Sequence, residues 1–296
     1  MLNSVSPGKW FPLKQSICES LVLRKTELQM GLLQTQYVGM DVIFLQEVAG
    51  VFVDKCETQP AIASVFHMMT PEQLDGKRDQ NSVLLLSKQR WDVSEAVELT
   101  DAIVEQLDGS NKKSVAAGDL FALSCKEIIT GDIYLLVSFH GDTNGQASIP
   151  LLQAVHTVAS SQSLKLVVGI DANTYQPGTK KLLPVQEFAA FCDEAGLSIC
   201  WGSRPEELAA AGCTTYNART YLQPQLNKAV GRAEVAGGEH RHLKDYLLCY
   251  ASQGKFSNTL KDNTGKGPGH YEEDLIFPTL SFPSDHGSVS SQMTPI

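Results

Sequence analysis

Short apolar runs and a few amphipathic patterns alternate along the chain. Runs of β-forming residues predict strands at 40–45, 82–87, 121–129, 133–139, 164–170 and 246–250. Helical spacing of apolar residues predicts helices at 15–36, 150–160 and 185–195. The many strands and few helices predict an α/β (α+β) protein in which two sheets pack face to face with helices outside.

Two further features of the pattern concern loops. Residues 130–132 are a short turn between two predicted strands, which indicates a hairpin. The Gly-, Lys- and Asn-rich stretch 254–269 is predicted to be a loop. Its glycines at 265, 267 and 269 lack the spacing and the Ser/Thr of a P-loop, so that type of nucleotide site is excluded.

Composition places the chain among soluble globular proteins. Its 296 residues are 43% hydrophobic and 19% charged, enough for a substantial core, and no repeat or linker divides the sequence. We therefore expect a single domain over residues 1–296. The seven cysteines are odd in number and scattered, and no signal-peptide pattern or membrane-length apolar run is present. These features favour reduced, mostly buried thiols in an intracellular protein of unspecified compartment and oligomeric state.

The charge distribution is uneven. A net charge of −9 argues against a protein that coats nucleic acid or anionic membranes nonspecifically. Residues 213–244, however, carry five basic against two acidic side chains, and Arg219 and Lys228 are among the basic ones. The window is either a solvated loop with incidental charge or a segment that attracts phosphate.

Polar side chains stand at the ends of five hydrophobic runs, in the segments LQEV, SFHG, GIDAN, KDYLL and SDH. Asp171 and Asn173, two residues apart, would face the same side of a strand, although such residues are also typical of a turn. One case of this kind is usually a cap or a turn, but five together favour a shared site. The residues concerned are Glu47, His140, Asp171, Asp245 and the pair Asp285 and His286.

The order of these motifs resembles the endonuclease/exonuclease/phosphatase superfamily, over about residues 41–289. That superfamily includes DNase-I-like nucleases, abasic-site endonucleases, deadenylases, sphingomyelinases and inositol-polyphosphate phosphatases. The resemblance implies a four-layer α/β/β/α sandwich with two mixed β-sheets, and a divalent-metal-dependent phosphoesterase. Hard oxygen ligands without a thiolate cluster suit Mg²⁺ or Mn²⁺.

Carried over residue by residue, the resemblance implies that Glu47 binds the metal. Asp171 would orient or deprotonate the attacking water, and Asn173 would hold a phosphate oxygen. His140 would make a further phosphate contact, and Asp245 would orient the imidazole of the last motif.

In that last motif, the resemblance implies that His286 contacts the scissile phosphate and that Asp285 helps to place the metal or the water. Members of the superfamily usually begin with a strand that carries a metal-site Asn. Here the sequence opens Met-Leu-Asn-Ser, so either Asn3 is that residue or the first strand is missing. The stretch 78–82 resembles a substrate-contact region, which makes Asn81 a further candidate.

Three functions stay open. The first is a nuclease-type phosphodiesterase on nucleic acid, which the basic window with Arg219 and Lys228 favours. The second is a phosphatase or phospholipase-type enzyme on inositol phosphates or lipid head groups; against it, the inositol 5-phosphatase signature Trp-Cys-Asp-Arg is replaced here by residues 242–245, His-Leu-Lys-Asp. The third is a catalytically silent relative that acts as a binding module.

Overall fold

The computed structural model describes residues 8–9, 12, 15–16, 19, 24–176, 181–216, 241–275 and 277–296. The chain forms two compact units. Unit 1 comprises Met1–Val38, Gly212–Leu243 and Leu260–Ser290, and unit 2 comprises Gly39–Ala211, Lys244–Thr259 and Ser291–Ile296. The single domain expected over residues 1–296 stays a prediction.

A six-stranded sheet is the centre of unit 2. The β6 and β7 strands are parallel, and the other pairs with a described register are antiparallel, so this sheet is mixed. The predicted hairpin is confirmed by the antiparallel pairing of β5 with β6. In spatial order the strands are β4 (Trp91–Glu98), β5 (Leu120–Glu127), β6 (Ile133–His140), β7 (Lys165–Asp171), β11 (Asp245–Tyr250) and β8 (Leu197–Ile199).

A smaller antiparallel sheet packs against the first. It contains β1 (Val42–Val48), β3 (Asn81–Ser87) and β2 (Phe66–Met69), in that order. Leu84 and Leu86 of β3 share one buried cluster with Phe121 of β5 and Leu136 of β6, so apolar side chains of both sheets interdigitate. The predicted pair of packed sheets is confirmed, although the described pairs of the smaller sheet are antiparallel.

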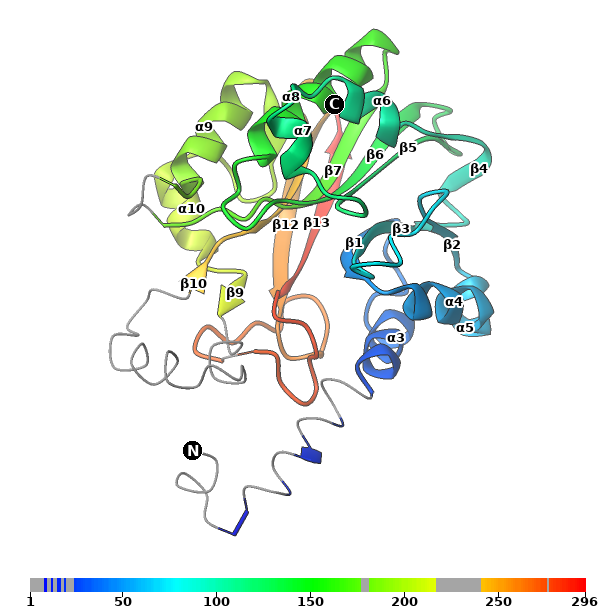
Figure 1. Cartoon of the computed structure of the whole chain (residues 1–296), viewed down its shortest axis with the longest axis vertical. Coiled ribbons are helices and arrows are strands. Elements are labelled where there is room, and N and C mark those ends of the chain that lie inside the picture. Colours follow the sequence, from blue (N-terminus) through cyan, green and yellow to red (C-terminus); the bar gives the residue numbers. More distant parts are fainter. Residues whose placement is uncertain are drawn as a thin grey trace. The chain divides into compact units, whose positions relative to one another are not determined.

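Helices cover the outer faces of both sheets in unit 2 (Figure 1). Every residue of β3 is buried, which requires a cover on each face of its sheet. The α8 and α9 helices lie along the larger sheet and α4 and α5 along the smaller one, giving the predicted α/β/β/α layers. The helices of unit 2 are α4 (Gly50–Thr58), α5 (Pro60–Ala63), α6 (Thr100–Glu105), α7 (Asn111–Ser114), α8 (Ser148–Ser161), α9 (Val185–Glu194) and α10 (Pro205–Ala211).

Unit 1 contains α3 (Lys25–Thr35) and a short ribbon of β9 (Thr215–Tyr216) with β10 (Arg241–His242). The predicted helix 15–36 is confirmed over α3, and much of its first part lies outside the described residues. The buried Asp262 organises the turn after it, because its carboxylate accepts hydrogen bonds from the backbone N–H groups of Thr264, Gly265 and Gly267.

The loop predicted at 254–269 is wrong in its first half, where β12 (Gly254–Asp262) is a strand. It pairs with β13 (Ser288–Pro295) in a two-stranded sheet. The sequence of β12 is mostly polar because most of its side chains are exposed or half-buried. A strand that depends on a distant partner more than on its own apolar residues leaves a weak local signal.

Six of the seven cysteines are buried thiols, as predicted, and Cys18 lies outside the described residues. Within the described part of the chain, no helix has the length and apolar character needed to cross a membrane. The intracellular setting stays a prediction.

Candidate active site

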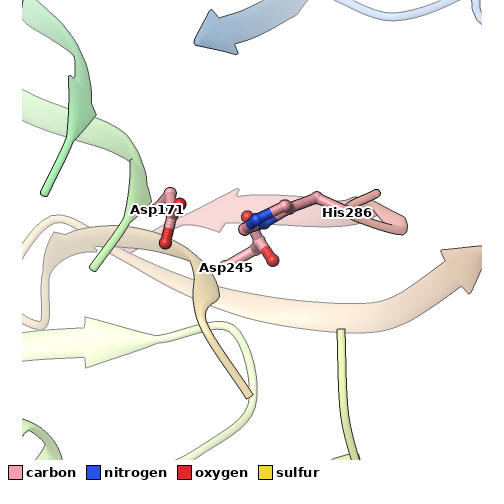
Figure 2. A group of neighbouring side chains, drawn as sticks. All are labelled: Asp171, Asp245 and His286. Carbon is pink, nitrogen blue, oxygen red and sulfur yellow. The ribbon is translucent and has the colours of Figure 1, made fainter. Parts of the chain in front are cut away.

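Three of the predicted residues stand in one row across the larger sheet. His140 pairs with Asp171 between the parallel strands β6 and β7, and Asp245 pairs with Asp171 between β11 and β7. A carboxylate oxygen of Asp171 and one of Asp245 lie within 4.8 Å of each other. Figure 2 shows the two carboxylates projecting from these neighbouring strands. The motifs SFHG, GIDAN and KDYLL, far apart in sequence, therefore meet at one edge of the sheet.

Glu47 reaches the same place from the smaller sheet. Its Oε1 lies 3.5 Å from His140 Nε2, and that nitrogen lies 3.7 Å from Asp171 Oδ2. Glu47 occupies the left-handed region with φ 54°, where the β1–β3 register is interrupted between Leu45 and Val48. This conformation costs a residue with a side chain roughly 1–2 kcal/mol, so the surrounding contacts must hold it.

Asn81 supplies one of those contacts. It is fully buried, its Nδ2 donates to Val48 O at 3.2 Å, and its Oδ1 accepts from Asp75 N at 2.7 Å. The amide thus fixes the backbone next to Glu47. These bonds give Asn81 a structural role, and its predicted contact with substrate stays a prediction.

His140 lies among three carboxylates. Besides Glu47 and Asp171, Asp119 Oδ1 is 3.8 Å from Nδ1, and Arg78 Nη1 donates to that same oxygen at 2.8 Å. Burial by itself would lower the pKa of His140, but the contact with Asp119 and the negative charges of Asp171 and Glu47 outweigh it and raise that pKa.

Asp119 is a neighbour of His140 that the sequence motifs do not include. The residue is buried, and its backbone oxygen also accepts from the N–H of His140 at 2.9 Å. Asp119 immediately precedes β5 and Asp245 opens β11, so an aspartate at the start of a buried strand was an available signal.

Asp171 and Asn173 form both a turn and a site. Strand β7 ends at Asp171, whose Oδ1 accepts from Asn173 N at 2.9 Å, and Asn173 has φ 48°. Asp171 and Asn173 therefore do not lie on one continuous strand, which the predicted alternation of side chains would require. Their side chains are nevertheless buried at the same strand end, with exposed fractions of 4% and 6%. The amide of Asn173 donates to Gly141 O at 2.8 Å and accepts from Lys244 Nζ at 2.5 Å.

Gly141 makes this packing feasible. A Cβ there would lie 2.8 Å from Ser148 Oγ and 3.0 Å from Asp171 O, closer than side-chain contacts normally allow. Since Gly141 N also donates to Asp171 O at 2.7 Å, the chain after His140 runs directly against the chain after Asp171. Gly141 is therefore needed for the two strand ends to approach.

The remaining candidates lie in unit 1 or outside the described residues. Asp285 and His286 belong to unit 1, and His286 is the third residue labelled in Figure 2. Asn3, Arg219 and Lys228 lie outside the described residues. Their roles stay predictions. Whether the first strand is missing stays a prediction too.

The donor set of unit 2 fits a hard divalent cation. Asp171 and Asp245 offer carboxylate oxygens within 4.8 Å of each other, and Glu47 offers another 3.5 Å from His140 Nε2. Such oxygens are the ligands that Mg²⁺ and Mn²⁺ take in proteins. Carboxylates that converge on one partly buried place repel one another, so bound positive charge would stabilise the arrangement.

No protein-family model matches the chain, and a comparison with curated protein sequences finds no match either. Solved structures do match. The human Nocturnin catalytic domain with bound sulfate anion is 14% identical with a TM-score of 0.59, covering 95% of this chain and 90% of that one. D. rerio TDP2 complexed with single strand DNA product is 12% identical with a TM-score of 0.57, covering 92% of each chain.

A mannosyl-6-phosphatase from Bacteroides thetaiotaomicron is 14% identical with a TM-score of 0.56, covering 91% of each chain. At such identities the likeness establishes the fold. Structures of endonuclease/exonuclease/phosphatase family proteins match in the same way. The chain therefore has the DNase-I-like fold of the endonuclease/exonuclease/phosphatase superfamily, as the order of its motifs predicts.

Proposed function

We propose that the protein is a divalent-metal-dependent phosphoesterase. The observation that carries the proposal is the row of His140, Asp171 and Asp245 across three adjacent strands, with Glu47 approaching from the facing sheet. Several carboxylates and an imidazole at one strand edge suit an anionic ester that is bound together with a cation. Their clustering favours activity over a silent binding module.

Glu47 would hold Mg²⁺ or Mn²⁺, and the carboxylates of Asp171 and Asp245 are close enough together to share a cation. When bound, the ion supplies positive charge that stabilises the phosphate and the leaving oxygen. The resemblance assigns Asp171 to the attacking water, whose proton its Oδ2 would accept. Burial and the hydrogen bond to its Oδ1 hold that carboxylate in one orientation.

Phosphate oxygens would be held by the N–H donors around Asp171. Asn173 Nδ2 has one hydrogen beyond its bond to Gly141 O, and His140 would donate from Nε2, the nitrogen between Glu47 and Asp171. We propose for His286 the scissile-phosphate contact that the SDH motif implies, with Asp285 helping to place the metal or the water.

Nucleic acid is the substrate class that we propose first. The structurally similar D. rerio TDP2 was solved with a single strand DNA product, and the window 213–244 of this chain is basic. A phosphomonoester substrate is the alternative, because the mannosyl-6-phosphatase shares the fold to a similar degree. The two substrate classes differ in length and charge, so the salt dependence of substrate binding distinguishes them.

A cleavage panel tests the proposal. Single-stranded DNA, RNA, inositol phosphates, sphingomyelin and a hexose 6-phosphate are incubated with Mg²⁺ or Mn²⁺, with and without EDTA. We expect the wild type to cleave one class in a metal-dependent way, Asp171→Asn to lose that activity, and Asp101→Asn, an exposed change on α6, to keep it. A folded wild type that hydrolyses no member of the panel would contradict the proposal.

A further inference from the structure

Lys244 lies directly beside the proposed phosphate-binding residues. It precedes β11, whose first residue Asp245 pairs with Asp171. The backbone oxygen of Lys244 accepts from Ala172 N at 2.8 Å, between Asp171 and Asn173. The sheet therefore fixes the backbone of Lys244 opposite the turn that carries both of these side chains.

The ammonium group of Lys244 is held by two residues of that turn. Nζ donates to Asn173 Oδ1 at 2.5 Å and lies 3.4 Å from Tyr175 Oη. It also lies 4.7 Å from the centroid of the Tyr175 ring, a favourable position for a cation. Tyr175 is itself anchored, because its hydroxyl donates to Thr143 O at 2.6 Å.

These contacts fix which way the Asn173 amide faces. An ammonium group only donates and a backbone carbonyl only accepts. Lys244 therefore binds Oδ1 while Gly141 O binds Nδ2, and rotating the amide by half a turn would lose both hydrogen bonds at once. Without Lys244, the single bond to Gly141 would have to hold the orientation.

We propose that Lys244 is a positioning residue that holds the Asn173 amide with its remaining N–H towards a substrate phosphate oxygen. The ammonium also adds positive charge next to that oxygen. The inference rests on the proposed function for the identity of the ligand, an oxyanion of a phosphate ester. It identifies Lys244 as a residue that affects phosphate binding through its hydrogen bond to Asn173.

Lys244→Met tests the role, because it keeps the length of the side chain but removes the charge and the donors. Lys244→Arg keeps both charge and donors, and Lys165→Met is the matched control. Lys165 lies at the opposite end of β7, where it pairs with Asp132. If Lys244→Met does not fold, Lys244→Leu serves the same comparison.

Two measurements do not depend on turnover: the NMR resonance of the Asn173 side-chain NH2 group, and the Kd for inorganic phosphate in the presence of Mg²⁺. We expect Lys244→Met to shift that resonance and to weaken phosphate about tenfold, the effect of one charge-assisted hydrogen bond. Lys244→Arg should restore part of the affinity, and Lys165→Met should change neither quantity. Turnover of bis(p-nitrophenyl) phosphate should show the same loss mainly in KM.

An unchanged Asn173 resonance, or phosphate affinity within twofold of the wild type, in folded Lys244→Met would overturn the inference. A wild type that cleaves no ester would overturn the proposed function instead. In that case the resonance shift and the phosphate measurement would still support the role of Lys244 in orienting Asn173.

Discussion

His140 and Asp171 stand opposite each other on the parallel strands β6 and β7, with Nε2 and Oδ2 3.7 Å apart. Theirs is the one parallel strand pair among the described registers of the larger sheet. The carboxyl ends of parallel strands meet at the same edge, and the antiparallel β11 begins there with Asp245. This topology explains why three separate motifs supply one site.

Asp171→Asn should remove most turnover while the protein stays folded. The substitution keeps the size of the side chain but removes the oxygen that accepts a proton from water, and such a role contributes about 10²–10⁴-fold in rate. We expect kcat to fall by at least about 10²-fold. The thermal midpoint of unfolding is measured on the same samples to check that the variant stays folded. Asp101→Asn is the control. Turnover near the wild-type level in folded Asp171→Asn would exclude Asp171 from the reaction.

Glu47→Gln should weaken metal binding. Glu47 is held in a left-handed conformation with its carboxylate 3.5 Å from His140 Nε2, so replacing it with an amide removes charge where we propose that the cation binds. We expect Mn²⁺ affinity, measured by calorimetry, to fall at least about tenfold. Glu57→Gln, an exposed change in α4, should leave the affinity unchanged. Equal affinity in the wild type and Glu47→Gln would remove Glu47 from the ligand set.

His286→Ala tests the part of the site carried by the SDH motif. The resemblance assigns His286 to the scissile phosphate, so we expect a loss in kcat of about 10²-fold or more with little change in Mn²⁺ affinity. Comparing this change with Glu47→Gln separates a phosphate contact from a metal ligand. A variant that loses metal and keeps its turnover number at saturating Mn²⁺ would assign His286 to the metal instead.

The sequence pattern predicts the strands whose own side chains are apolar and buried. The apolar runs of β3, β6 and β7 are visible in sequence because both faces of these strands are covered. Strand β12 was missed because its polar side chains depend on pairing with the distant β13. Lys244 was missed as a site residue because its role comes from its contact with Asn173, which no local spacing reveals.

Arg219→Ala and Lys228→Ala test the basic window 213–244, and both residues lie in the part of it that is outside the described residues. If the window steers a polyanion, each change should weaken oligonucleotide binding several-fold at low salt and much less at high salt, since ions screen such attraction. Lys112→Ala, an exposed change in α7, is the control. Binding of a single-stranded oligonucleotide is measured by anisotropy at two salt concentrations. Equal weakening at both concentrations would exclude steering.

Glu127 should make the stability of the fold depend on acid. The side chain is 1% exposed at the turn of the β5–β6 hairpin. Its carboxylate accepts from Thr130 N and Oγ1, both at 2.6 Å, and from Ile129 N at 3.0 Å, and it lies 3.0 Å from Arg90 Nε. Burial by itself would raise the pKa of Glu127, but these hydrogen bonds and the Arg90 charge outweigh it and lower that pKa.

A pKa lowered by folding means that the unfolded chain binds the proton more tightly. The stabilisation by Glu127 is therefore fully present above the unfolded value of about 4.3, and it is lost as the pH falls through the lower folded value. Glu127→Gln removes the charge and turns an NH2 group towards hydrogen-bond donors. It should therefore lower the free energy of unfolding by about 2–4 kcal/mol at pH 7. The free energy of unfolding, measured by urea denaturation between pH 7 and pH 3, should then fall less steeply with acid in Glu127→Gln than in the wild type. Glu105→Gln, an exposed change on α6, should keep the wild-type slope, and identical slopes in all three proteins would show that Glu127 does not couple folding to pH.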